Sequence, residues 1–160
     1  MKYPFEPKST SNLRQGQYWC FQLCDGRYCA VVVLSRVTDN GKLDRRLFTA
    51  ALVDWVGSKP AVPSDLVKPK LLKRGFTHVR AVQMYGRVIL GEVPRRLAEF
   101  PEEFPFSYAA TPGWPVLGLA VLRYDAEMRW GDKEWVLREI AIERAPLDRN
   151  PHLKKVHIDV

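Results

Sequence analysis

Side chains that could perform catalysis are few in this sequence, and none stands in a recognisable arrangement. Nucleophilic or general-base catalysis requires a nucleophile, a base and a group that orients the base. The histidines are His78, which opens an expected strand, and His152 and His157, which lie in a polar tail. The motifs of serine hydrolases, zinc proteases, dinucleotide-binding folds and phosphate-binding loops do not occur. We therefore expect no enzyme, no catalytic residue, no cofactor and no small-molecule substrate.

Three cysteines, Cys20, Cys24 and Cys29, stand close together without a histidine or a fourth cysteine at zinc-ligand spacing. If Asp25-Gly26 forms a two-residue turn, Cys20 faces Val31 and Cys29 faces Gln22, so the two thiols are diagonal neighbours with Cα atoms roughly 7–8 Å apart. That separation is too long for an unstrained disulfide. We expect three reduced thiols and no metal site.

Charged residues could also bind a partner. An adjacent pair, Glu102 and Glu103, could serve acid–base chemistry, but such a pair in a proline-rich stretch is more typical of a solvated loop. A second group combines basic and aromatic residues, which is the composition of a single-stranded nucleic-acid surface, although we favour a solvated basic face with core aromatics. Its members are Arg45, Arg46, Lys68, Lys70, Lys73, Arg74, Phe48, Trp55 and Phe76.

The composition predicts one globular domain over residues 1–160, because 46% of the residues are hydrophobic and 27% are charged. The net charge of +7 is uneven: residues 1–97 carry +10, residues 98–143 carry −5 and residues 144–160 carry +2. Met1 to Lys8 lacks the apolar stretch of a signal peptide, and the longest apolar run, Cys29 to Leu34, is far shorter than a membrane span. We expect a cytoplasmic protein that does not enter a membrane.

The elements that must position these residues begin with a hairpin over Gln17 to Val37. Asp25-Gly26 between two β-rich runs is a strong signal for a type I′ turn, because both central residues of that turn need positive φ. In the resulting register six residues share the core face. They are Trp19, Phe21, Leu23, Tyr28, Ala30 and Val32.

Further short strands follow, separated by turn residues. We expect a polar turn over Thr38 to Arg46, a strand over Leu47 to Val56, and a loop over Gly57 to Pro69 with a helical turn opened by Ser64. A second hairpin is expected to pair His78–Met84 with Arg87–Val93 across Tyr85-Gly86. Together these segments predict a mostly β (α+β) fold, either a partly open barrel or a strongly curled antiparallel sheet.

Residues 98–160 are expected to form an extension packed on this β-rich core. Five prolines make Pro94 to Pro115 a linker or covering loop, and Val116 to Leu122 is expected to be a strand. Trp130 to Ala145 fits two structures: a helix capped by Asp132, which we favour, or a hairpin that turns at Gly131-Asp132.

Short motifs in the first part of the chain resemble a known family. Residues 16–19 read Gly-Gln-Tyr-Trp, 25–28 Asp-Gly-Arg-Tyr, 54–57 Asp-Trp-Val-Gly and 86–91 Gly-Arg-Val-Ile-Leu-Gly. Over roughly residues 1–97 this order resembles the immunity protein 26 family of bacterial polymorphic toxin systems. The resemblance implies a non-catalytic protein that binds and neutralises a cognate toxin encoded beside it. It also implies scaffold positions at Gly16, Trp19, Asp25, Gly26, Tyr28, Asp54, Trp55, Gly57, Gly86 and Gly91.

The resemblance does not locate the toxin-binding surface, but the composition offers a candidate. Leu97 to Pro115 is the longest stretch without a regular pattern, and functional surfaces often lie on loops held by a rigid scaffold. It mixes carboxylates, which could steer a basic partner, with aromatic residues that could anchor it. The alternative, which we favour, is a covering loop that folds its phenylalanines back over the open end of the barrel. The predicted partner-binding residues are Glu99, Glu102, Glu103, Phe104, Phe106 and Tyr108.

The positive net charge differs from what is expected of an inhibitor that blocks a nuclease. Such inhibitors often present carboxylates to a basic cleft, and a chain of net charge +7 fits that poorly. The acidic residues 98–143 could still supply a local acidic surface. Otherwise the toxin is not a nuclease, or this fold has taken another role.

Overall fold

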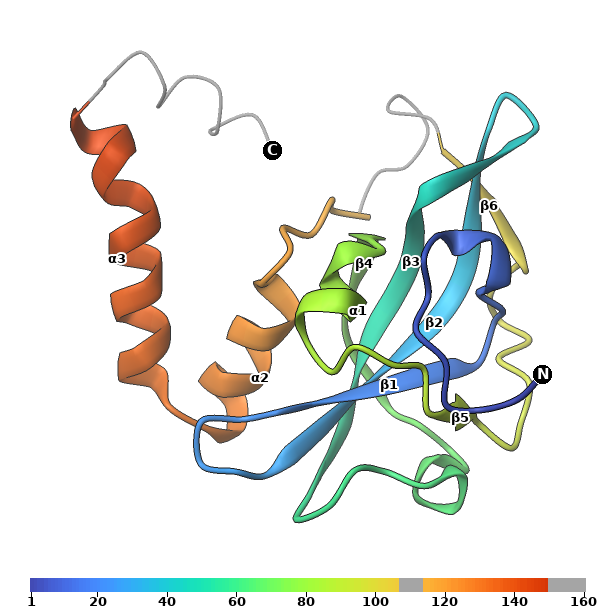
Figure 1. Cartoon of the computed structure of the whole chain (residues 1–160), viewed down its shortest axis with the longest axis horizontal. Coiled ribbons are helices and arrows are strands. Elements are labelled where there is room, and N and C mark those ends of the chain that lie inside the picture. Colours follow the sequence, from blue (N-terminus) through green and yellow to red (C-terminus); the bar gives the residue numbers. More distant parts are fainter. Residues whose placement is uncertain (107–113, 150–160) are drawn as a thin grey trace.

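The computed structural model describes residues 1–106 and 114–149, with side chains up to residue 144 (Figure 1). Within these residues the fold is a sheet of six strands with three α-helices and two short 3₁₀ helices at Thr10–Asn12 and Pro63–Leu66. The strands are β1 (Gln17–Gln22), β2 (Tyr28–Asp39), β3 (Lys42–Gly57), β4 (Leu71–His78), β5 (Gly91–Glu92) and β6 (Glu103–Pro105). The helices are α1 (Arg80–Met84), α2 (Val121–Trp130) and α3 (Lys133–Arg149). No helix in these ranges is long and apolar enough to cross a membrane.

The main path of the sheet runs in the order β4-β3-β2-β1-β5, with every neighbouring pair antiparallel. Strand β6 joins from outside this path and pairs in parallel with residues 36–38 of β2, beyond the segment of β2 that β1 covers. The register between β2 and β3 shifts at three places, and such bulges bend and twist a strand. The prediction of a mostly β, curled and unclosed sheet is therefore confirmed.

Both faces of the sheet are buried. On one face Trp19, Phe21 and Phe48 pack with residues of α1 and α2, which cover that side. On the other face Tyr18 and Leu34 pack under the loop that follows β3 and the segment around Leu97. Because neighbouring side chains of a strand point to opposite faces, β1 and β2 carry unbroken apolar runs instead of an alternating pattern.

The first hairpin forms where expected, but its register differs by one residue. Leu23 N–H donates to the carbonyl of Arg27, which leaves Cys24, Asp25 and Gly26 as the loop. Gly26 has φ of +89°, as a three-residue hairpin loop with a glycine bulge requires. Trp19 consequently faces Val31, and Cys20 faces Ala30, not Val31.

This shift separates the expected core face into two groups. Trp19, Phe21 and Leu23 lie in the core beneath α1 and α2, as predicted. The other three residues of the predicted face belong to the opposite side of the sheet; they are Tyr28, Ala30 and Val32. The prediction was wrong for them because one added loop residue turns every side chain of the second strand to the other face.

The same register keeps the cysteines apart. Cys20 and Cys29 are buried on opposite faces of the hairpin, Cys24 is exposed, and all three thiols are free. Burial raises the pKa of Cys20 to about 11 and raises that of Cys29 further. Burial and then Glu127 also raise the pKa of Cys24.

We predict that a thiol reagent at neutral pH modifies Cys24 slowly in the native protein and all three cysteines after unreduced unfolding. Exposure makes Cys24 the accessible thiol, while burial protects the other two. The measurement is a colorimetric thiol count before and after addition of guanidinium. A Cys24→Ser variant should lose the native reaction and keep two thiols when unfolded. A count of one thiol in the unfolded wild-type chain would contradict the free-thiol structure.

Two further turns resemble the prediction closely. The expected polar turn is the two-residue turn Asn40-Gly41, with both φ positive, and β3 begins earlier than expected at Lys42. The loop after β3 contains the expected helical turn at Pro63–Leu66. That turn is capped by Val62, not by Ser64: the Val62 N–H donates to the Asp65 carboxylate at 2.9 Å.

The second predicted hairpin is wrong. His78 ends β4 instead of opening a strand, and residues 80–84 form α1. The short helix α1 buries both Ala81 and Val82. Tertiary packing therefore overrides the β propensity of the segment. Strand β4, which pairs along β3 from Val53 to Leu47, was not predicted.

The C-terminal part contains a correction and a confirmation. The expected strand at Val116–Leu122 is wrong: Val116 makes only an isolated bridge to Phe76, and α2 begins at Val121. The helix favoured for Trp130–Ala145 is confirmed as α3. The Asp132 carboxylate accepts the Trp135 N–H at 2.8 Å, which is the expected N-cap interaction.

Glu127 attaches the helices to the tip of the hairpin between β1 and β2. Its side chain is fully buried and accepts hydrogen bonds from the N–H groups of Cys24 (2.5 Å) and Asp132 (2.7 Å). Arg27 donates to the carbonyl of Trp130 at 2.5 Å beside it. We call this group, Cys24, Arg27, Glu127, Trp130 and Asp132, the tip junction.

Candidate functional site

The predicted partner-binding segment lies at the end of the sheet as strand β6. Glu102 and Glu103 are exposed there, yet both are paired: Glu102 with Arg96 at 2.8 Å and Glu103 with Arg36 at 3.0 Å. Glu99 is exposed. Tyr108 lies outside the described residues. The carboxylates of this segment therefore do not form a purely acidic surface.

Phe104 and Phe106 fold back over the sheet as a covering loop would, but they cover Phe76 of β4 and not the open end of a barrel. Both contact the edge of the Phe76 ring, with centroid distances of 5.5 Å and 5.0 Å. Phe76 is buried, and the two rings above it are half-buried. Trp114 and Phe100 complete an aromatic cluster. These rings hold β6 in place and offer only part of their surface to a partner.

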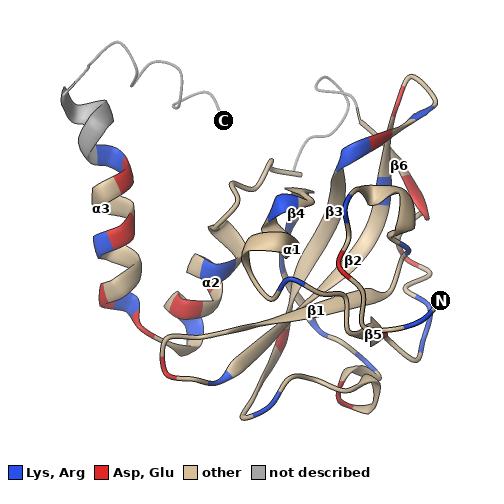
Figure 2. Ribbon diagram, in the orientation of Figure 1, with Lys and Arg blue, Asp and Glu red and all other residues tan. Residues whose placement is uncertain are grey.

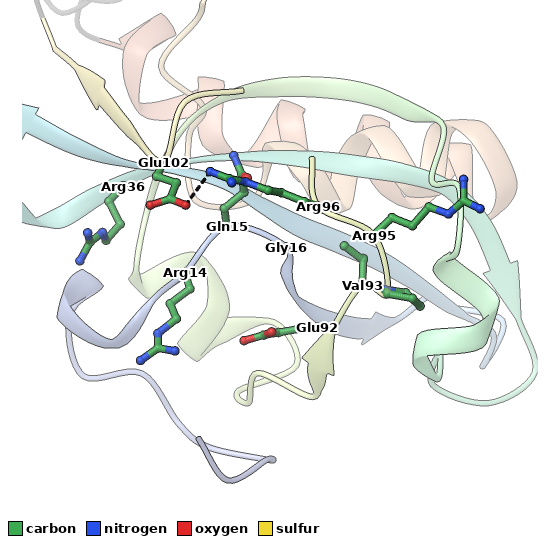
Figure 3. A pocket seen from close by; sticks show the side chains of 10 residues that line it. Arg14, Gln15, Gly16, Arg36, Glu92, Val93, Arg95, Arg96 and Glu102 are labelled. Atoms are coloured by element: carbon green, nitrogen blue, oxygen red, sulfur yellow. Dashed lines mark hydrogen bonds and ion pairs between the residues drawn. The ribbon is translucent and has the colours of Figure 1, made fainter. Parts of the chain in front are cut away.

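A cleft of about 680 Å³ lies beside β6 and contains the Glu102–Arg96 ion pair (Figure 3). We call it the arginine cleft, because four arginines from three separate segments line it against two glutamates. Figure 3 shows Arg96 and Glu102 turned toward one another, and Arg95 extending away from that pair. The lining residues are Arg14, Gln15, Gly16, Arg36, Glu92, Val93, Pro94, Arg95, Arg96 and Glu102.

Hydrogen bonds to backbone carbonyls fix the floor of the cleft. The Gln15 side chain donates to the carbonyls of Leu34 (2.9 Å) and Phe100 (2.8 Å), so it ties the segment before β1 to the segment before β6. Gly16 N–H donates to Val33, and Val93 N–H donates to Gly16, each at 2.9 Å. The arginines therefore extend from a rigid base.

Glu92 on the wall of the cleft has its own partner. The Tyr3 hydroxyl donates to the Glu92 carboxylate at 2.5 Å and accepts from the Gln17 amide at 3.1 Å. Burial, followed by the hydrogen bond to Glu92, raises the pKa of Tyr3. The hydroxyl thus stays protonated at neutral pH and remains a donor to Glu92.

Two arginines of the cleft lack an acidic partner in the part of the chain that the structure describes. These are Arg14 and Arg95, whose side chains make no ion pair there. Arginine stays charged at any physiological pH, and its planar fork matches carboxylate and phosphate oxygens. The cleft therefore has a surplus of positive charge suited to binding oxyanions.

The basic and aromatic residues considered for nucleic-acid binding do not form a stacking platform. Phe48 and Phe76 are buried, and Phe48 contacts the Trp19 ring at 5.9 Å. Trp55 is half-buried at the edge of the core. The Arg74 guanidinium lies over the Trp114 ring at 5.1 Å. Bases could therefore not stack on the two phenylalanines without unfolding part of the core.

His78 has a local structural role. Its Nδ1 atom accepts the Arg80 N–H at 3.1 Å. Burial and the charges of Arg80 and Arg46 lower the pKa of His78, which favours the neutral ring. His152 and His157 lie outside the described residues. In residues 1–106 and 114–144 no group of three or more His, Cys, Asp or Glu side chains could hold a metal ion.

The scaffold motifs lie in the framework of the fold. Trp19 is buried, and Tyr28 and Trp55 pack at the core edge. Asp54 pairs with Lys70 and Arg129. The other motif positions lie in turns or close backbone approaches: Gly16, Asp25, Gly26, Gly57, Gly86 and Gly91.

Sequence reasoning missed the arginines of the cleft. Arg14, Arg36 and Arg96 are far apart in the chain and come together only through the strand order. The one available signal was the Arg95-Arg96 doublet shortly before Glu102 and Glu103. Comparisons with protein-family models, curated proteins and solved structures give no match.

Proposed function

We propose that the chain is a non-catalytic immunity protein that binds and neutralises a cognate bacterial toxin in the cytoplasm, as a stoichiometric complex. The proposal is supported by the resemblance of residues 1–97 to the immunity protein 26 family. Those motif residues serve the sheet and its turns, so they provide a scaffold, and toxin binding requires a separate surface.

The observation that carries the proposal is the open charged surface at β6. It combines the arginine cleft with the exposed carboxylates of Glu99, Glu102 and Glu103. Small-molecule sites enclose most of the ligand and have mainly apolar walls, whereas this cleft is half-open and six of its ten lining residues are charged. Arginine is enriched at protein interfaces and among their hot spots. A protein partner therefore fits this surface better than a small molecule.

We predict that co-expression with the toxin encoded by the neighbouring gene yields a stable equimolar complex and restores growth of the host cell. The complex would be detected by size-exclusion chromatography with light scattering, and neutralisation by colony counts after toxin induction. An unrelated toxin provides the control and should remain lethal. Continued killing by the neighbouring toxin, with both proteins eluting separately, would refute the proposal.

A nucleic-acid-binding module that uses the basic residues 1–97 is the rival function. Phosphate contacts weaken steeply as salt rises. A gel-shift titration with 20-nucleotide single-stranded DNA and RNA separates the two functions. The immunity proposal expects no shift at 150 mM salt. A specific shift that disappears as salt increases would favour the rival.

A further inference from the structure

We infer that the arginine cleft binds an acidic segment of the partner protein: one carboxylate of that segment replaces Glu102 at Arg96, and another pairs with Arg14. This inference rests on the proposed toxin-binding function and specifies its chemistry. It differs from the expectation that carboxylates 99–103 attract a basic partner.

The ion pairs at the cleft favour an acidic partner. Glu103 is held by Arg36 and Glu92 by Tyr3, so neither carboxylate is available without losing its present partner. Arg14 has no acidic partner in the described part of the chain. A basic segment entering here would meet this unpaired guanidinium, whereas an acidic segment would neutralise it.

Glu102 occupies the position that a partner carboxylate would take. The Glu102 and Arg96 side chains are 65% and 71% exposed, and exposed ion pairs contribute only about 0–1 kcal/mol. The Glu102 carbonyl is fixed separately, because it accepts the Arg36 N–H at 2.9 Å. The Glu102 side chain can therefore swing away while its backbone stays in place.

The backbone at the base of the cleft is already fixed before a partner carboxylate replaces Glu102. Gln15 and Gly16 hold the segment that carries Arg14 against β2 and the strand preceding Arg96. Binding would then order only side chains, which lowers the entropic cost of association. The positive balance of residues 1–97 would also attract an acidic partner over longer distances.

The inference is tested with the complete chain and the neighbouring toxin, by binding kinetics at 50 and 300 mM salt. The double variant Arg14→Gln/Arg96→Gln should weaken binding by about 10–100-fold, as expected when charge pairs at an interface are lost. The control Arg45→Gln/Arg80→Gln removes the same charge from exposed arginines outside the cleft and should change affinity by less than about 3-fold. Melting temperatures would verify that all variants are folded.

The variant Glu102→Gln shows whether the partner segment that meets Arg96 is acidic or basic. It removes the internal competitor of Arg96, so binding should strengthen a few-fold. Weaker binding of Glu102→Gln would show that the carboxylate itself meets a basic partner and would overturn the inference. Equal effects of the cleft and control double variants would also overturn it while leaving the toxin-binding proposal intact.

A second measurement stands independently of the toxin. Fluorescent hexaglutamate peptide is titrated into the free protein at 50 mM salt, with hexalysine as the opposite-charge control. Hexaglutamate should bind, be released by salt and lose most of its affinity in Arg14→Gln/Arg96→Gln. Absence of binding, or equal binding to the cleft variant, would overturn the inference. Much stronger competition by pyrophosphate or by a short RNA would show that the cleft prefers phosphate, which would also overturn it.

Discussion

Replacement of Trp19 by alanine should lower the free energy of unfolding by about 3–5 kcal/mol, the usual cost of removing a buried tryptophan ring. Trp19 is 1% exposed and packs edge to face with Phe48, with the ring centroids 5.9 Å apart. It lies on β1, in the core that α1 and α2 cover, so the cavity cannot fill with water or collapse easily. Equilibrium unfolding in urea, followed by circular dichroism, would measure the loss.

Trp55→Ala is the matched control for that experiment. The Trp55 ring packs at the edge of the second core and lies over Gly57. It is half-buried, so its removal should cost clearly less than removal of Trp19. Equal losses for the two variants would show that Trp19 is not a central packing residue of the sheet.

Gly86→Ala is expected to destabilise the protein by about 3 kcal/mol or more, which combines the cost of a left-handed backbone with that of overpacking. Gly86 has φ of +93°, and an added Cβ would lie 2.0 Å from the carbonyl oxygen of Cys20. That oxygen belongs to the backbone of β1, which pairs with β2 at this position. A side-chain rotation cannot relieve the contact between the added Cβ and the Cys20 carbonyl oxygen. The chain after α1 would therefore have to shift.

Gly41→Ala separates the two contributions to the Gly86 effect. Gly41 also has positive φ, at +75°, but an added Cβ would meet nothing within 4 Å. Its replacement should therefore cost only the conformational strain, about 1–2 kcal/mol. If both alanine variants unfold at the same urea concentration, the predicted contact with β1 does not limit this position.

The sequence predicted the elements whose signal is local. The polar turn expected over Thr38 to Arg46 forms at Asn40-Gly41, where both residues accept positive φ, and Asp132 located the start of α3 because its carboxylate caps the first turn. The first hairpin was located correctly, but its register was not. The difference between a two-residue and a three-residue loop at Asp25-Gly26 is small locally, yet it reverses the faces of an entire strand.

Elements set by tertiary contacts were not predictable in the same way. The segment of α1 contains valine and methionine, and it forms a helix because Ala81 and Val82 then both reach the core. Strand β4 contains the basic pair Lys73-Arg74 and a central Gly75. Glycine is unfavourable in a strand, but here Pro115 and Leu117 approach too closely for any side chain at that position.

The candidate site was predicted in part. Glu102 and Glu103 were identified, but not the arginines that neutralise them; Arg36 and Glu103 are 67 positions apart. The charge of −5 over residues 98–143 likewise does not produce an acidic face. Glu127 is buried, and acidic and basic residues alternate along α3 (Figure 2). Segment charge alone could not reveal these pairings.

The tip junction joins two parts of the protein that should unfold separately: the sheet, and helix α3, which extends beyond the junction. Helix α3 packs chiefly on α2 and extends away from the sheet (Figure 1), with Leu137 and Ile142 exposed on it. Most helical stability in proteins comes from tertiary packing, and α3 has little of it beyond α2. The amide hydrogens of α3 beyond Val136 should therefore exchange with solvent through local fraying, at rates that stay the same when the sheet is stabilised. Amides in the centres of β2 and β3 should exchange only through global unfolding, so the sheet and the distal part of α3 should show two different levels of protection.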